Sequence, residues 1–163
     1  MIGTLTLAAA LRDQLEQEAK AAFPRECCGL IEGVRTLSLR VYAETSAGQQ
    51  ILPVPRSPGE GGSKAGITAL HPTSNLASEP DRFEIDPATH IGLLRNLRGT
   101  NRAIIGCYHS HPSGRAEPSP GDIAGAGEVD FLWLITALKG ATDRPYLACF
   151  VWTGSEFVKV RMV

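Results

Sequence analysis

Residues 103–122 constrain the fold more than any other part of this 163-residue chain, because they join a strand-like segment to two histidines and a helix start. The apolar segment 103–108 is rich in β-branched and aromatic residues and predicts a buried strand. His109 and His111 follow at its end, and side chains two residues apart in a strand point to the same side. Pro112 then ends the ladder. We therefore expect the two imidazoles to converge on one point.

A helix start follows after a short loop. Ser119 suits an N-cap, Pro120 the first helical position, and Asp122 completes a Ser-x-x-Asp pattern. His109, His111 and Asp122 then form a suitable three-ligand set for one Zn²⁺ per chain, with water in the fourth position. Each part also has a simpler explanation, because a capping box needs no metal and a histidine pair at a strand end can face solvent. Their combination in one segment favours a metal site.

The pattern H-x-H-x₇-S-x-x-D resembles the zinc signature of JAMM metalloproteases, the catalytically competent members of the MPN-domain family. Residues 24–33, with the sequence Pro-Arg-Glu-Cys-Cys-Gly-Leu-Ile-Glu-Gly, are similar to the glutamate-bearing segment of short, free-standing bacterial members. The resemblance runs from about Leu7 to the C-terminus, and residues 46–80 match it poorly.

The resemblance implies a role for each residue of the pattern. His109, His111 and Asp122 would hold zinc, and no other cofactor is expected. Glu26 would act as general base and acid, and Ser119 would donate a hydrogen bond to the oxyanion.

The implied activity is a zinc-dependent peptidase or isopeptidase. Its substrate would be an amide bond after the C-terminal Gly-Gly of a ubiquitin-like or sulfur-carrier protein. Two alternatives stay open: a zinc hydrolase of small amides or cell-wall peptides, and a non-catalytic MPN scaffold. Scaffolds of that kind typically lack the ligands, whereas this chain keeps them all.

Hydrophobic periodicity predicts an α+β fold, with a single mixed, mostly antiparallel curved sheet flanked by helices. This is also the layering that the MPN and cytidine-deaminase-like resemblance implies. We expect one domain over residues 1–163. Helices are predicted after Thr6, Asp86 and Ser119, the second one burying Ile91, Leu94 and Leu97. Strands are predicted at 26–31, 36–43, 82–85, 103–108, 131–136, 146–152 and 156–161, the first two joined as a hairpin by a turn at Gly33.

Residues 46–80 are dominated by Gly, Pro and Ser without clear periodicity, and they predict a mobile insertion. A lid or recognition loop and a tolerated disordered segment remain equal alternatives. Residues 51–54 and 66–70 are candidates for short strand pieces. His71 is expected to be a solvated loop residue, not a fourth ligand.

Composition limits the partners. The net charge is −1 and the basic residues are dispersed, which argues against nucleic acid. No apolar run reaches the ~18–20 residues of a membrane span, and the first residues lack a signal-peptide pattern, so we expect a cytoplasmic protein. The four cysteines fit buried reduced thiols. Strand alternation would send Cys27 and Cys28 to opposite faces, where one of them can line the site; the oligomeric state stays open.

Overall fold

The computed structural model describes residues 1–36 and 63–163. Within these ranges the strands are β1 (Ile2–Thr6), β2 (Cys28–Thr36), β3 (Ser63–Thr73), β4 (Ala103–His111), β5 (Leu132–Ala137), β6 (Tyr146–Trp152) and β7 (Phe157–Met162). The helices are α1 (Ala9–Ala22), α2 (Pro87–Asn96) and α3 (Pro120–Gly125). None of the helices in these two ranges has the length and hydropathy that crossing a membrane requires.

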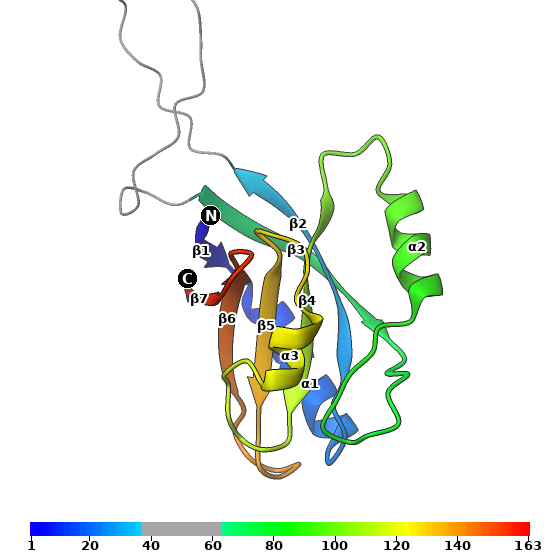
Figure 1. Ribbon diagram of the computed structural model, residues 1–163, viewed down its shortest axis with the longest axis vertical. Coiled ribbons are helices and arrows are strands. Elements are labelled where there is room, and N and C mark those ends of the chain that lie inside the picture. Colours follow the sequence, from blue (N-terminus) through cyan, green and yellow to red (C-terminus); the bar gives the residue numbers. More distant parts are fainter. Residues whose placement is uncertain (37–62) are drawn as a thin grey trace, which may run out of the picture.

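The described strands close into a barrel in the order β1-β3-β2-β4-β5-β6-β7 (Figure 1). The pairs β1–β3, β1–β7 and β4–β5 are parallel, and the other pairs are antiparallel. The predicted mixed sheet with flanking helices is confirmed, but the sheet is a closed barrel instead of an open curved one. The reason is β1, which the sequence pattern did not predict and which bridges β3 and β7.

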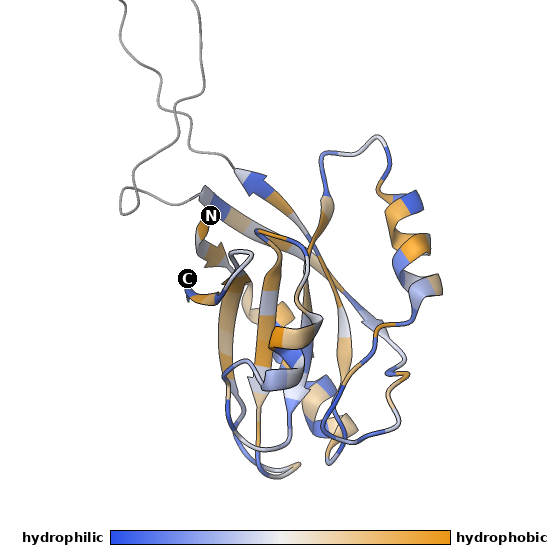
Figure 2. Ribbon diagram, in the orientation of Figure 1, coloured by the Kyte–Doolittle hydropathy of each residue, from blue (hydrophilic) through white to orange (hydrophobic). Residues whose placement is uncertain are grey.

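The largest core cluster joins the strands to α1. Leu5, Ile31 and Leu134 belong to it, and Leu15 of α1 is buried against them. Burial of such apolar side chains contributes about 1.5–3 kcal/mol each. Figure 2 shows the same division, with largely hydrophobic residues along β5 and β6 and hydrophilic residues in the loops below them.

Tyr108 fixes α1 to the sheet. Its ring is fully buried, and its hydroxyl donates a hydrogen bond of 2.6 Å to Glu18 Oε2 on α1. Gly29 on β2 makes this packing possible, because a Cβ at that position would overlap the Tyr108 ring.

Helix α2 begins at Pro87, as predicted, and packs against β2 and β4. Of the three residues predicted to be buried on its inner face, only Leu97 is buried. Leu93 is the second buried residue, whereas Ile91 and Leu94 are each 49% exposed. The helix therefore lies rotated relative to the predicted orientation, and it buries a narrower apolar stripe than the sequence offers.

The region around β2 and β3 corrects several predictions. Gly33 is not a turn but lies within β2. The antiparallel neighbours of β2 are β4 and β3, and the predicted insertion at 46–80 contains most of β3. The open alternative of a strand piece at 66–70 is therefore confirmed. The strand is hard to recognise because polar residues, Gly and Pro interrupt its buried positions. Of the predicted strand 36–43, Thr36 is the last residue of β2, and residues 37–43 lie outside the described residues, as does the predicted segment 51–54.

Two smaller corrections concern the same half of the chain. His71 is part of β3 and is half-buried, so the prediction of a solvated loop residue is wrong. Residues 82–85 do not form a full strand, since only Ile85 makes an isolated bridge, with Asn75. Helix α3 ends at Gly125, earlier than predicted, where small residues weaken helicity.

Candidate metal centre

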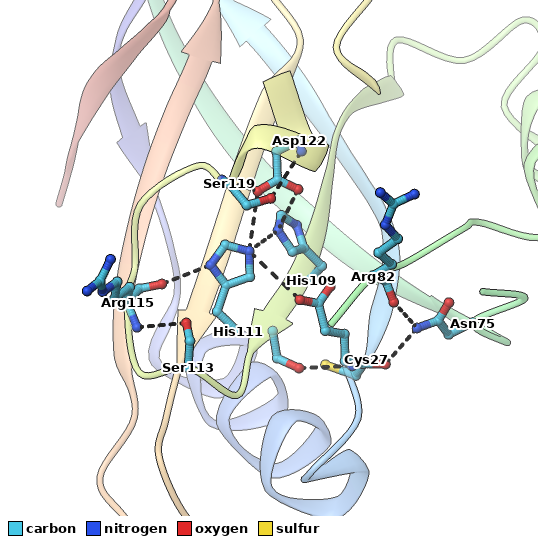
Figure 3. Close-up of polar contacts among 11 residues, drawn as sticks. Cys27, Asn75, Arg82, His109, His111, Ser113, Arg115, Ser119 and Asp122 are labelled. Atoms are coloured by element: carbon cyan, nitrogen blue, oxygen red, sulfur yellow. Dashed lines mark hydrogen bonds and ion pairs between the residues drawn. The ribbon is translucent and has the colours of Figure 1, made fainter. Parts of the chain in front are cut away.

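The two histidines of β4 converge as the strand alternation predicts. Both are buried, and their Nε2 atoms lie 2.9 Å apart. His111 Nδ1 lies 2.8 Å from the carbonyl oxygen of Arg115, and the ring donates its proton to that acceptor (Figure 3). This hydrogen bond leaves the Nε2 lone pair of neutral His111 directed at the same point as His109.

Asp122 closes the cluster from the first turn of α3. Its Oδ1 lies 3.3 Å from His109 Nε2, and its Oδ2 lies 3.3 Å from His111 Nε2. The capping box is also present: the Asp122 amide donates to Ser119 Oγ at 3.1 Å, and the Ser119 amide donates to Asp122 Oδ2 at 2.6 Å. Asp122 can therefore cap α3 and face the histidines at the same time, because the capping hydrogen bond holds its carboxylate in place.

The donor set suits a metal ion. Two imidazole nitrogens and a carboxylate, all buried, face one point, and this combination of N and O donors is typical of catalytic zinc sites. The ligand atoms of Glu26, His109 and His111 also lie within 4.8 Å of one another. Of the two carboxylates, that of Asp122 is nearer to the histidines, because the Glu26 Oε1 to His111 Nε2 distance is 4.0 Å.

Charge within the cluster follows from burial and contacts. Burial lowers the pKa of His109 and so favours its neutral form. Burial would raise the pKa of Asp122, but the adjacent imidazoles of His109 and His111 hold that pKa well below its usual range. The cluster therefore presents an ionised carboxylate beside at least one neutral imidazole.

Glu26 lies immediately before β2, and the fold brings it to the cluster although it is far away in the sequence. Its amide donates to the carbonyl of Pro80 at 3.1 Å, and its carbonyl accepts from Asn75 Nδ2 at 3.0 Å. Burial raises the pKa of its carboxyl to about 7, and the charge of Asp122 adds to this effect while His111 opposes it. A carboxyl with such a pKa can both accept and release a proton near neutral pH.

Asn75 is a positioning residue that the sequence did not reveal. Its Nδ2 donates to the carbonyls of Glu26 and Arg82 at 3.0 and 2.8 Å (Figure 3). Its Oδ1 accepts from the amides of Ala77 and Glu84, both at 3.0 Å. One side chain thus joins the backbone of Glu26 to the segment that precedes α2. A local sequence pattern does not reveal the contact between Asn75 and Glu26, because the two residues lie far apart in the chain.

Phe83 is a second contact that sequence reasoning missed. Its ring stacks on His109 with centroids 4.2 Å apart and an interplanar angle of 18°, and Trp133 meets the same imidazole edge-on at 5.9 Å. These rings cover His109 and limit its rotation. The sequence signal for this contact was the presence of an aromatic residue at position 83, but the segment 82–85 was predicted only as a strand.

The remaining predicted residues fall into two groups. Ser119 is half-buried at the cap, whereas Ser113 and Arg115 are exposed in the loop between His111 and α3. The cysteines are all free. Cys28, Cys107 and Cys149 are buried as predicted, and Cys27 is half-buried next to Ser110, whose Oγ accepts from the Cys27 amide at 2.9 Å. Burial raises the pKa of the Cys27 thiol to about 12, so it stays protonated.

A mixed barrel that carries a buried His-His-Asp cluster at the end of one strand places the chain in the JAMM and MPN class of domains, as the sequence resemblance implies. Residues 8–149 match the family of prokaryotic homologues of the JAB domain, and the chain belongs to this family.

Three relatives illustrate the match. A desampylase of Haloferax volcanii is 34% identical over 92 residues, which cover 56% of this chain and 63% of that protein. A desampylase of Pyrococcus furiosus is 32% identical over 66 residues, which cover 40% of this chain and 47% of that protein. Each match thus spans less than two thirds of the relative. The solution structure of a Desulfitobacterium hafniense protein has the same fold, with a TM-score of 0.73, 22% identity, and coverage of 98% of this chain and 91% of that one.

Proposed function

We propose that this protein is a zinc-dependent JAMM-type peptidase or isopeptidase. The observation that carries the proposal is the convergence of His109, His111 and Asp122 on one point, with Glu26 beside them. The proposed substrate is the amide bond after the C-terminal Gly-Gly tail of a ubiquitin-like or sulfur-carrier protein. Two relatives named desampylases support a substrate of the small-modifier kind.

In this proposal His109, His111 and Asp122 hold one zinc ion. When bound, zinc lowers the pKa of water toward ~7 and polarises the carbonyl of the amide. Glu26 takes the proton from the attacking water and returns it to the leaving amine, for which its pKa of about 7 is well placed. Asn75 holds the backbone of Glu26 in the position that this proton transfer requires.

Ser119 stabilises the oxyanion that forms at the attacked carbonyl. Its Oγ accepts a hydrogen bond from the Asp122 amide, which leaves its own proton available to donate. One donor of this kind contributes about 2.7–4 kcal/mol to the transition state. The same hydroxyl therefore serves the cap and the reaction.

The cysteines bear on the cellular compartment in which the reaction takes place. We place the chain in the cytoplasm, because its cysteines are free and their thiols suit a reducing compartment. Residues 1–163 would act as one catalytic domain without nucleic acid or membrane as partner.

The experiment that tests this function combines zinc analysis with cleavage. Purified protein should contain one zinc per chain, and His109→Ala should lose both the zinc and the cleavage of a ubiquitin-like carrier that bears a C-terminal extension. His90→Ala on α2 is the matched control and should keep both. Stoichiometric zinc in the His109→Ala protein would contradict the ligand set. Cleavage of small peptides without cleavage of the carrier would contradict the substrate.

A further inference from the structure

A second feature lies away from the metal centre. An open pocket of about 890 Å³ lies between α1, the start of β6 and β7. Pro145, Leu147 and Val160 are its buried apolar lining residues. Figure 1 shows β6 and β7 on the side of the barrel opposite to α2.

The rim of this pocket is positively charged. Arg12, Arg144, Lys159 and Arg161 line it and are exposed, and Glu16 is the single acidic residue among the lining residues. None of the four cations forms an ion pair with a described residue. Because the whole chain has a net charge of −1, this rim is a local excess of positive charge on a slightly acidic protein.

An aromatic side chain adds to the rim. Tyr146 is 60% exposed, which is unusual for an aromatic ring at the start of a core strand. The Nζ atom of Lys159 lies 6.0 Å from the centroid of its ring. Exposed tyrosine and arginine side chains are the types enriched in surfaces that bind other proteins.

The basic surface continues toward the metal centre. A smaller cavity of about 350 Å³ shares Arg144 and Tyr146 with the first pocket and adds Lys139. Its one acidic lining residue is Asp143, whose carboxylate accepts a hydrogen bond from the Lys139 amide. Gly114, in the loop that joins His111 to α3, also lines this cavity. A partner seated on both cavities therefore contacts the loop whose Arg115 carbonyl orients His111.

We propose that this basic surface, formed by Arg12, Lys139, Arg144, Lys159 and Arg161, binds an acidic segment of the protein whose C-terminal tail is cleaved. This inference rests on the proposed function and adds an attachment point for the body of the substrate. A protein segment fits better than a small molecule, because the cations are exposed and spread over two open cavities, whereas small ligands are held in enclosed pockets. Complementary charge of this kind speeds encounter and fixes orientation.

Charge reversal tests the proposal. In Arg144→Glu/Lys159→Glu, the KM for an acidic ubiquitin-like carrier with a C-terminal extension should rise about tenfold, as expected for the loss of two surface ion pairs and the repulsion that replaces them. Its kcat, its zinc content and its cleavage of a short peptide copied from the carrier tail should not change. The difference in KM should vanish at 1 M salt, where the Debye length is about 3 Å.

The matched control is Arg95→Glu/Arg98→Glu on and after α2, which has the same change in charge on the opposite side of the barrel. Equal KM values for the two double variants would overturn the proposal and leave the hydrolase itself intact. A rise in KM for the short peptide as well would also overturn it, because the effect would then lie at the metal centre.

A binding measurement separates this inference from the proposed function. If wild-type protein cleaves neither substrate, the function fails, and the pocket is tested by fluorescence anisotropy with a fluorescein-labelled octaglutamate peptide. Binding that is lost in Arg144→Glu/Lys159→Glu and kept in the control supports an acidic-segment surface. No binding by wild-type protein overturns it. Displacement of the peptide by inorganic phosphate at equal concentration of charge would indicate a small-anion site and overturn the assignment to a protein segment.

Discussion

Glu26 and Glu32 lie six positions apart, and both are buried, with exposures of 6% and 3%. Glu32 accepts hydrogen bonds from Arg102 Nη1 at 2.7 Å and Thr68 Oγ1 at 2.8 Å, and it contacts His71 Nε2 at 3.0 Å. The carboxylate of Glu26, by contrast, accepts no hydrogen bond from a described side chain or amide, and its nearest charged contact is at 4.0 Å. Two carboxylates with similarly low solvent exposure therefore have opposite polar environments.

The pKa values of the two carboxyl groups differ for two reasons: Glu26 is surrounded more deeply by protein, and only Glu32 has hydrogen-bond donors. Burial would raise the pKa of both carboxyl groups, but for Glu32 the contacts from Thr68, His71 and Arg102 outweigh it and lower the pKa. For Glu26 burial dominates and the pKa reaches about 7. Hydrogen-bond donors thus make Glu32 a fixed anion that stabilises the barrel, and their absence leaves Glu26 free to exchange a proton.

The largest expected effect is on turnover. Glu26→Gln should lower kcat by about 10²–10⁴-fold while zinc content and fold stay unchanged, because the variant loses only the proposed proton-transfer group. Glu84→Gln, an exposed neighbour, is the control. Zinc content and cleavage rate measured on one preparation distinguish three outcomes. Loss of zinc would make Glu26 a ligand, and unchanged cleavage would make it a spectator.

The second effect should be on stability alone. Glu32→Gln should lower the free energy of unfolding by about 1–2 kcal/mol, since its contacts are charge-assisted but Arg102 is partly exposed. Urea denaturation measures this change, and kcat should equal that of wild-type protein. Glu156→Gln, which is exposed, serves as control. A loss of turnover with full stability would mean that the two glutamates do not differ in role as described.

A smaller effect is expected for the residue that positions Glu26. Asn75→Ala removes the hydrogen bonds to the backbone of Glu26 and Arg82, so kcat should fall by about tenfold through misplacement of the carboxyl group. Zinc content and the KM for a short peptide should stay unchanged. Asn96→Ala at the end of α2 controls for loss of a surface amide. If kcat is the same in both variants, other contacts position Glu26.

The smallest effect is the pH dependence of stability, and its sign differs between the two carboxyl groups. The lowered pKa of Glu32 means that its contribution is present above its unfolded-state pKa near 4.5 and is lost as pH falls through the folded value. Zinc-free wild-type protein should therefore lose its stability advantage over Glu32→Gln below about pH 4.5.

The raised pKa of Glu26 has the opposite consequence. Its ionisation destabilises the zinc-free fold as pH rises from 4.5 through about 7, so zinc-free Glu26→Gln should be more stable than wild-type protein at pH 8. Urea denaturation across pH 3–8 checks both signs. A parallel pH dependence of the two variants would contradict the contrast between the glutamates.

Local spacing indicated that His109 and His111 point to one side and that Asp122 lies in the first turn of a helix, because strand alternation and the helix cap are set by neighbouring residues. It favoured a cluster of the three side chains but left a simple cap and solvent-facing histidines as alternatives. Glu26 required the family resemblance, because its approach depends on contacts with Pro80 and Asn75 that no local pattern encodes. The contacts of Phe83 and Asn75 were missed for the same reason.

The fold shows the same limit. Continuously apolar segments such as β6 were predicted with their exact bounds, and the predicted start of α2 at Pro87 was also correct. Strand β3 was only an open alternative, and β1 was missed, because short strands with polar and glycine residues resemble loops when no partner is known. Closure of the barrel, which depends on β1, therefore lay beyond the sequence pattern.

That closure has a consequence for self-association. Strand β1 pairs with β7 through only two residue pairs, extended by hydrogen bonds of 3.1 Å from the Leu7 amide to the Val163 carbonyl and 2.9 Å from the Val163 amide to the Leu5 carbonyl. Because β1 joins β3 to β7, the described sheet has no open edge. Deletion of residues 2–6 would uncover the amides and carbonyls of both β3 and β7, and unpaired strand edges are templates for pairing with other molecules. A few residues of β1 therefore protect the whole sheet from edge-to-edge aggregation.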